Sequence, residues 1–172
     1  PLSDNEYKIP VPYLDGVFDT ILDKEKNLAV QFETNRGCPY RCTFCDWGGV
    51  ARSKISKLED SLVNETIEYI LKFKSVKRLE ILDANFGIFP DRDMAITDYI
   101  LDVQARTGYP ATVNANWHKN AKQNVIEIVK KFISNGFNRG MTLSVQSMDV
   151  DLFKIIKRKN MQSSHLGEMM DL

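Results

Sequence analysis

Only three cysteines occur among the 172 residues, so no fourth thiol is present to complete a four-cysteine metal centre. A disulfide would leave one thiol over, and nothing else in the sequence suggests secretion. A structural zinc site takes four protein ligands, usually as two close pairs from separate elements. The two histidines, His118 and His165, have no partner at ligand spacing. The cysteine count therefore disfavours both a disulfide and an ordinary zinc site.

Net charge is also lacking, since 23 basic and 23 acidic side chains cancel. Without a global field, nothing in the composition indicates binding to nucleic acid or to anionic lipid. No apolar run approaches the length of a membrane span, and no signal peptide is visible. Clustered thiols and neutral charge fit a protein of the reducing cytoplasm. The hydrophobic content of 43% is enough for one core of ordinary domain size.

The cysteines that are present form one short motif. Cys38, Cys42 and Cys45 have the spacing C-x-x-x-C-x-x-C and follow Leu28–Phe32, an apolar run typical of a buried strand. A bacterial ferredoxin loop has a different spacing and a distant fourth cysteine, so it is a poor match. Three thiols on one loop indicate a metal centre with one coordination position left open. An iron–sulfur cluster is the favoured hypothesis from the residues alone, and structural zinc is the alternative.

Strand and helix patterns alternate four times along the chain. The expected strands are residues 28–32, 76–82, 111–116 and 141–146. The expected helices are residues 58–73, 91–107, 121–134 and 150–159, approximately. The predicted N-caps are Asp60 or Ser61 for the first helix and Asn120 for the third, and Gly108 is predicted to end the second. This alternation predicts an α/β fold with a parallel sheet.

The parallel sheet could be an open doubly wound sheet or part of a barrel, and two features favour the barrel. No phosphate-binding glycine fingerprint follows the first strand. Polar residues come just after every strand: the cysteine loop, Asp83 and Asn85, Asn116 and His118, Gln146 and Ser147. In a barrel these strand ends meet at one face, where active sites lie.

The cysteine motif resembles the signature of radical S-adenosylmethionine (SAM) enzymes, with Phe44 at the aromatic position before the third cysteine. The flanking residues 33–37 and 46–48 resemble most closely the members that also carry a cobalamin-binding domain. The resemblance implies a TIM-like barrel of about six strand–helix units, of which this chain holds the first four. Residues 1–27 would be an N-terminal linker, and residues 28–172 the truncated N-terminal part of the radical SAM core. The missing barrel units and a possible upstream cobalamin domain would lie outside this chain.

The same resemblance implies the cofactors. Cys38, Cys42 and Cys45 would hold three irons of a 4Fe-4S cluster, and the amino and carboxylate groups of SAM would bind the fourth iron. Reductive cleavage of SAM would then give a 5′-deoxyadenosyl radical for hydrogen abstraction, or SAM would serve in methyl transfer. A flavodoxin- or ferredoxin-like protein would supply the electron. The sequence does not name the substrate, and cobalamin dependence is implied only by the similarity.

Expected SAM contacts follow from family positions. Phe44 is expected to pack near the adenine, or merely within the loop. Family members commonly have Gly-Gly-Glu after the second strand, and this chain has Asp83-Ala84-Asn85 there. Asp83 or Asn85 is therefore expected to accept a hydrogen bond from the SAM ammonium, unless either only forms an Asx turn.

Three further contacts are expected from the last unit. Gln146 and Ser147 would face the ribose or the methionine part of SAM. Arg158 would pair with the SAM carboxylate, or would simply be a cation at the end of a helix. His118 is a candidate on the substrate side. The alternative function is a non-catalytic zinc- or cluster-bearing module that mediates contacts in a larger assembly.

Overall fold

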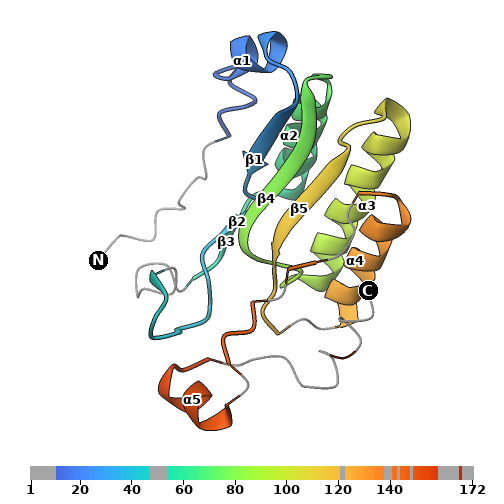
Figure 1. The fold of residues 1–172 in the computed structure, drawn as a ribbon. Helices are drawn as coiled ribbons and strands as arrows, with labels where there is room; N and C mark the ends of the chain where they lie inside the picture. The colour runs from blue at the N-terminus through green and yellow to red at the C-terminus, as the bar shows by residue number, and fades with distance from the viewer. Residues whose placement is uncertain are drawn as a thin grey trace.

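The structure is a computed structural model that describes residues 11–46, 54–120, 123–137, 141–142, 144–147, 149–158 and 167. A three-stranded parallel sheet lies at its centre, in the order β1-β4-β5 (Figure 1). The strands are β1 (Leu28–Phe32), β4 (Val76–Phe86) and β5 (Thr112–Trp117). The predicted α/β fold with a parallel sheet is therefore confirmed. Trp47 and Gly48, part of the family-like stretch, lie outside the described residues.

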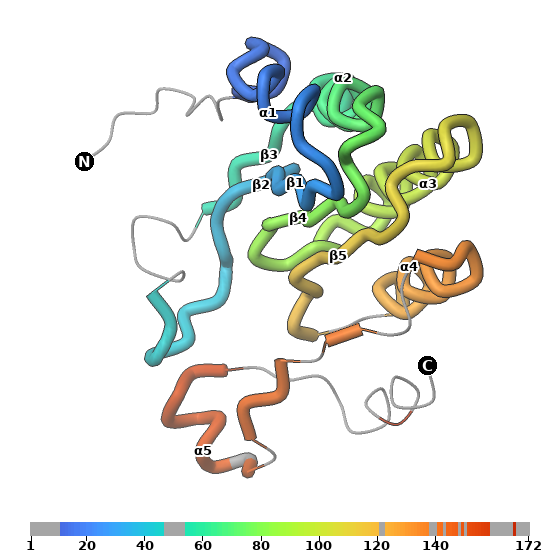
Figure 2. The backbone as a smooth tube through the Cα atoms, turned by 45° about the horizontal axis from the view of Figure 1, so that its top comes forward, coloured from blue at the N-terminus to red at the C-terminus, as the bar shows by residue number. Residues whose placement is uncertain are grey.

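Three helices cover one face of this sheet. They are α2 (Asp60–Leu71), α3 (Pro90–Thr107) and α4 (Gln123–Ser134). Figure 2 shows them together on one side of the strands, with the cysteine loop and the short helix α5 (Val150–Ile155) away from them. Strand and helix alternate along the chain, as the sequence predicted for its first three units.

The core lies between the sheet and these helices. Ile67 and Ile70 of α2, Leu79 of β4, Ile100 of α3 and Phe132 of α4 are all fully buried in it. Removing each such side chain from water contributes roughly 1.5–3 kcal/mol. This packing fixes the strands and, with them, the loops that follow their carboxyl ends. No helix in the described part of the chain is long and apolar enough to cross a bilayer.

Short elements complete the fold. Helix α1 (Asp19–Lys24) buries Leu22 against the edge of the core. Strands β2 (Asn35–Arg36) and β3 (Ser56–Lys57) pair antiparallel just after β1. The cysteine loop therefore begins directly after β2, close to the carboxyl end of β1.

Helix boundaries agree with the sequence at some ends and differ at others. Gly108 ends α3 in the left-handed conformation with φ of 78°, as predicted. The predicted N-cap of α2 is wrong: Glu59 holds that position and makes no side-chain cap. The Asp60 carboxylate instead accepts a hydrogen bond from Arg92 Nε at 2.7 Å. The cap predicted at Asn120 is not tested, because residues 121–122 are not described.

The fourth predicted unit differs most. The strand expected at 141–146 is wrong, because residues 141–142 and 144–147, which are described, contain no strand. Arg158 Nη2 donates to the carbonyl of Ser144, so a side chain and not a neighbouring strand binds that backbone oxygen. The following helix, α5, ends at Ile155 and not near residue 159. Strand β4 is also longer than expected, since it runs on through Asp83 and Asn85 to Phe86.

Candidate functional site

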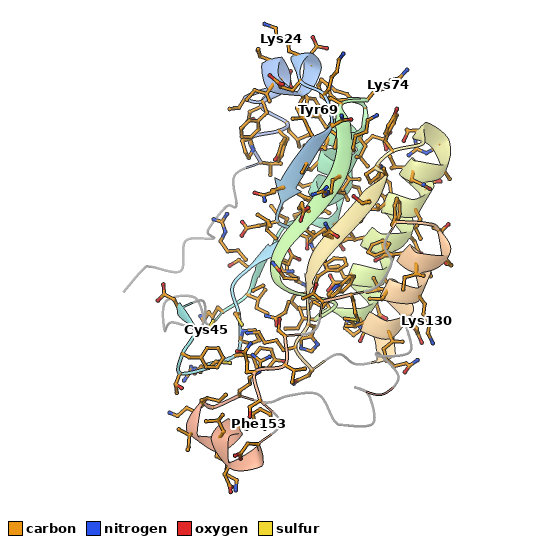
Figure 3. All side chains as sticks on the ribbon, in the orientation of Figure 1. Lys24, Cys45, Tyr69, Lys74, Lys130 and Phe153 are labelled. Atoms are coloured by element: carbon orange, nitrogen blue, oxygen red, sulfur yellow. The ribbon has the colours of Figure 1, made fainter. Side chains whose placement is uncertain are left out.

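The three cysteines lie at the carboxyl end of the sheet. Figure 3 shows Cys45 and Phe153 at this end, and Lys24, Tyr69 and Lys74 at the opposite end. All three are free thiols: Cys38 and Cys42 are 1% and 4% exposed, and Cys45 is partly exposed. A turn in which Cys45 N donates to Cys42 O at 3.1 Å brings the second and third cysteines together. The loop therefore offers three sulfur ligands within one compact segment.

The segment that leads into the loop is anchored to β4 by Asp83. One carboxylate oxygen accepts the backbone N–H groups of Thr34 at 2.6 Å and Asn35 at 3.1 Å. The other accepts the Thr34 hydroxyl and the Asn35 side-chain amide. From α3, Arg92 donates to Thr34 Oγ1 and to the Thr34 carbonyl, each at 3.0 Å. This buried network fixes the path of the chain four residues before Cys38.

Burial raises the pKa of Asp83 to about 6, and the charge of Asp93 adds to this rise. The hydrogen bonds from Thr34 and Asn35 oppose it, because their N–H and O–H groups favour the ionised form. Both Asp83 oxygens are thus engaged with the protein. Its expected contact with a SAM ammonium stays a prediction, and the geometry gives Asp83 the position of an anchor.

Asn85 lies two residues farther along β4 and contacts the first cysteine directly. Its Nδ2 is 3.3 Å from Cys38 Sγ. The side chain is 1% exposed, and its Oδ1 is a buried acceptor with no hydrogen-bond partner among the described residues. An unpaired buried carbonyl is costly unless a bound group supplies a donor. This orphaned oxygen beside a buried thiol fits the presence of a cofactor with a donor group.

A pocket of 240 Å³ opens beside the loop. It is lined by Cys38, Cys45, Ala84, Ala115, Asn116, Trp117, Lys119, Thr142 and Ser144. The ends of β4 and β5 therefore meet Thr142 and Ser144 at one place. Lys119 was not among the site residues predicted from the sequence, although it directly follows His118 at the end of β5.

Gln146 and Ser147 do not line this pocket. Gln146 is exposed, and the Ser147 hydroxyl accepts the backbone N–H of Asp149 at 3.0 Å. Phe44 is 53% exposed, so its ring is not packed inside the loop. The expected contacts of these three residues with SAM stay predictions.

A second group of residues connects the cysteine loop to the end of β5. Tyr40 Oη lies 2.6 Å from Nε2 of the buried His118, and their rings stack at 5.9 Å. Burial and the negative charges of Cys38 and Cys42 raise the pKa of Tyr40, while Arg158 lowers it. Tyr40 therefore links the loop to the end of β5, a pairing that no local pattern in the sequence indicates.

The last described segment also contacts the loop. Thr43 N donates to the carbonyl of Ile156 at 3.0 Å, and Figures 1 and 2 both place α5 next to the loop. Arg158 is buried and lies close enough to influence Tyr40. Its predicted pairing with a SAM carboxylate is untested. In the described part of the chain, no three His, Cys, Asp or Glu side chains are arranged to hold a single metal ion.

Comparison with known proteins confirms the resemblance to radical SAM enzymes with cobalamin association. No family model matches the chain. It is 40% identical over 155 residues to the cobalamin-dependent radical SAM methyltransferase TokK of Streptomyces tokunonensis. It is equally similar to the 2-(S-pantetheinyl)-carbapenam-3-carboxylate methyltransferase of Streptantibioticus cattleyicolor. The matches cover 88% of this chain but only 22% of each relative, so the chain spans about a fifth of their length.

Two solved structures share the fold. Both are of the cobalamin-dependent SAM radical enzyme OxsB, one with aqua-cobalamin and SAM bound and one with aqua-cobalamin alone. Their TM-scores are 0.55 and 0.56 at 16% and 18% identity. Each match covers 91% of this chain and 23% of the OxsB chain. The likeness concerns the fold.

Proposed function

We propose, on the premise that this chain belongs with the radical SAM enzymes, that it is the part of such an enzyme that binds a 4Fe-4S cluster and SAM. The observation that supports this most directly is the pairing of Cys38 with Asn85 beside the pocket. One thiol of a three-cysteine loop is held there by an amide whose oxygen has no donor among the described residues. When bound, these cofactors supply one-electron chemistry that cleaves the carbon–sulfur bond of SAM.

The residues of the chain would divide the work of binding. Cys38, Cys42 and Cys45 would ligate three irons. Asn85 Oδ1 would accept a hydrogen bond from the SAM ammonium, because this atom is buried and unpartnered among the described residues. Phe44 would pack on the adenine with the half of its surface that is exposed.

The last unit would complete the SAM site. Arg158 would bind the carboxylate, because it is buried and its charge acts on Tyr40 of the cysteine loop. Gln146 and Ser147 are proposed to reach the ribose or the methionine part. The sheet β1-β4-β5 would be the start of a TIM-like barrel, with further strands supplied beyond residue 172.

Methyl transfer with cobalamin is the proposed reaction type, because the two sequence relatives are named as methyltransferases and TokK as cobalamin-dependent. Cobalamin would be bound by a domain outside this chain. A flavodoxin- or ferredoxin-like partner would deliver the electron. The substrate is left open, since substrate-binding groups would come largely from the parts of the protein outside this chain.

Anaerobic reconstitution with iron and sulfide tests the proposal. We expect about 4 irons per chain, a brown absorbance that oxidation bleaches, and a changed electron–nuclear spectrum when SAM is added. A colourless protein with one bound zinc would support the structural-module alternative instead. A cluster whose spectra do not respond to SAM would contradict the open-iron assignment.

A further inference from the structure

The Asn85 side chain has two hydrogen-bonding groups in different situations. Its amide nitrogen lies 3.3 Å from Cys38 Sγ, while its oxygen is buried without a partner among the described residues. A ligating thiolate has no proton to give, so the hydrogen bond to sulfur must come from the amide N–H. The oxygen then necessarily points elsewhere and is left as a free acceptor.

A hydrogen bond to a ligand sulfur changes the electronics of a cluster. The donor withdraws charge from the sulfur, and this stabilises the reduced cluster, which carries the extra negative charge. Asn85 should therefore raise the reduction potential. Burial strengthens the effect, because Asn85 and Cys38 are each only 1% exposed and water does not compete for the bond.

The two ends of the amide are also coupled to each other. A donor bound at Oδ1 polarises the group and makes its N–H a stronger donor, as in other hydrogen-bond chains. Binding at the oxygen and reduction at the sulfur should then assist one another, and linkage requires this assistance to be reciprocal.

We infer that Asn85 couples SAM binding to the reduction potential of the cluster, by donating to Cys38 Sγ and accepting from the SAM ammonium. This inference rests on the proposed function, because it needs both the cluster and SAM. Asn85 would be a positioning residue for Cys38 and a binding residue for SAM. The coupling would make the cofactor-bound cluster easier to reduce than the cofactor-free one.

Two variants distinguish the role of the amide N–H from that of the amide oxygen. Asn85→Asp keeps an acceptor oxygen but loses the N–H, and Asn85→Leu loses both within a similar volume. Asn116→Asp is the matched control, because it adds the same charge to the pocket wall from a residue that has no hydrogen bond to a cysteine among the contacts described. Each reconstituted protein is titrated for its midpoint potential by electron paramagnetic resonance, with and without SAM, and its SAM affinity is measured.

We expect both Asn85 variants to shift the potential downward, Asn85→Asp by more than Asn116→Asp. SAM affinity should fall about tenfold to a hundredfold in Asn85→Leu and should be largely kept in Asn85→Asp. The upward shift of the potential on SAM binding should be smaller in Asn85→Leu than in the parent.

Unchanged potentials in both Asn85 variants would overturn the inference, as would loss of iron in both, which would make Asn85 a purely structural support. A parent protein that forms no cluster, or whose cluster ignores SAM, would instead refute the proposed function. The two failures are therefore distinguishable.

Discussion

The end of β4 and the segment 141–158 lie at the same end of the sheet, but they are held in different ways. Beside β4, the Asp83 carboxylate ties down Thr34 and Asn35, and Arg92 adds two hydrogen bonds to Thr34 from α3. These groups are buried, and β4 is paired on both sides. The first side of the cysteine loop is therefore fixed by the core itself.

The 141–158 segment has weaker support in its described part. It contains no strand, and α5 has six residues, of which Ile155 is 72% exposed. The Thr43 N–H bond to the Ile156 carbonyl joins it to the cysteine loop, whereas the Arg158 bond to Ser144 lies within the segment itself. Segments with few buried contacts open more readily than the core does. The comparison indicates that Cys38 is held by the core, while the far side of the loop depends on a lightly packed segment.

The largest expected effect is the loss of the cluster when any one cysteine is removed. Cys38→Ala, Cys42→Ala and Cys45→Ala should each abolish retention of iron, because the chain has no spare thiol. Iron content after anaerobic reconstitution measures this, and Thr43→Ala in the same loop is the control that should keep its iron. A cysteine variant that retains about 4 irons per chain would show the ligand assignment to be wrong.

Gly87→Ala, directly after β4, should lower the free energy of unfolding by roughly 2–5 kcal/mol. Gly87 has φ of 91°, and an added Cβ would lie 2.6 Å from Val125 Cγ2. Gly108→Ala is the matched control, since Gly108 has a similar φ of 78° but nothing within 4 Å of the added Cβ. It should cost only about 1 kcal/mol of backbone strain. Denaturant unfolding compares the two, and equal losses would mean that the contact with Val125 relaxes freely.

Features with a local cause could be predicted from the sequence. The thiol spacing, the strand–helix alternation and the stop of α3 at Gly108 each depend on neighbouring residues, and each appears in the structure. The meeting of the ends of β4 and β5 beside the cysteine loop also followed, because parallel strands present their carboxyl ends at the same edge. Of the described polar residues expected there, Cys38, Cys45 and Asn116 line the pocket, and the others do not.

Features that depend on distant partners could not be predicted. Asp83 meets Thr34 across 49 residues, and Asn85 meets Cys38 across 47. The sequence assigned both residues to the cofactor. In the structure both oxygens of Asp83 accept hydrogen bonds from the protein, and its contact with SAM stays a prediction. The prediction of a strand at 141–146 was wrong for a related reason. Alternating apolar residues favour a strand, but a strand forms only where a neighbouring strand pairs with it.

The Asp83 anchor should impose a pH dependence on stability. Its pKa rises from 3.8 when unfolded to about 6 when folded, so the folded state binds the proton more tightly. The contribution of Asp83 is fully present below about pH 3.8 and is lost as pH rises through 6. The free energy of unfolding should therefore fall by about 2 kcal/mol between pH 4 and 7, relative to Asp83→Asn.

Denaturant unfolding of both proteins across this range measures the difference. Arg92 and Asp93 face the same network and remain in the variant, so the difference reports Asp83 together with its charge coupling to Asp93. A difference that rises with pH would show that the hydrogen bonds from Thr34 and Asn35 outweigh burial and hold the pKa of Asp83 below its ordinary value.

The smallest effect is expected in the lightly packed segment. The Asp149 carboxylate caps α5 by accepting the N–H groups of Asp151 at 2.8 Å and Leu152 at 3.2 Å. Asp149→Ala should cost about 1 kcal/mol locally, which speeds hydrogen exchange of these two amides about fivefold. Global unfolding should change by less than about 0.5 kcal/mol, because α5 opens independently of the core. Asp151→Ala, which removes an exposed ion pair with Lys154 and an acidic side chain of the first turn but leaves the cap in place, is the control. If Asp149→Ala instead lowers global stability by the full cost of the cap, the 141–158 segment unfolds together with the β4 side, and the contrast between the two halves of the site disappears.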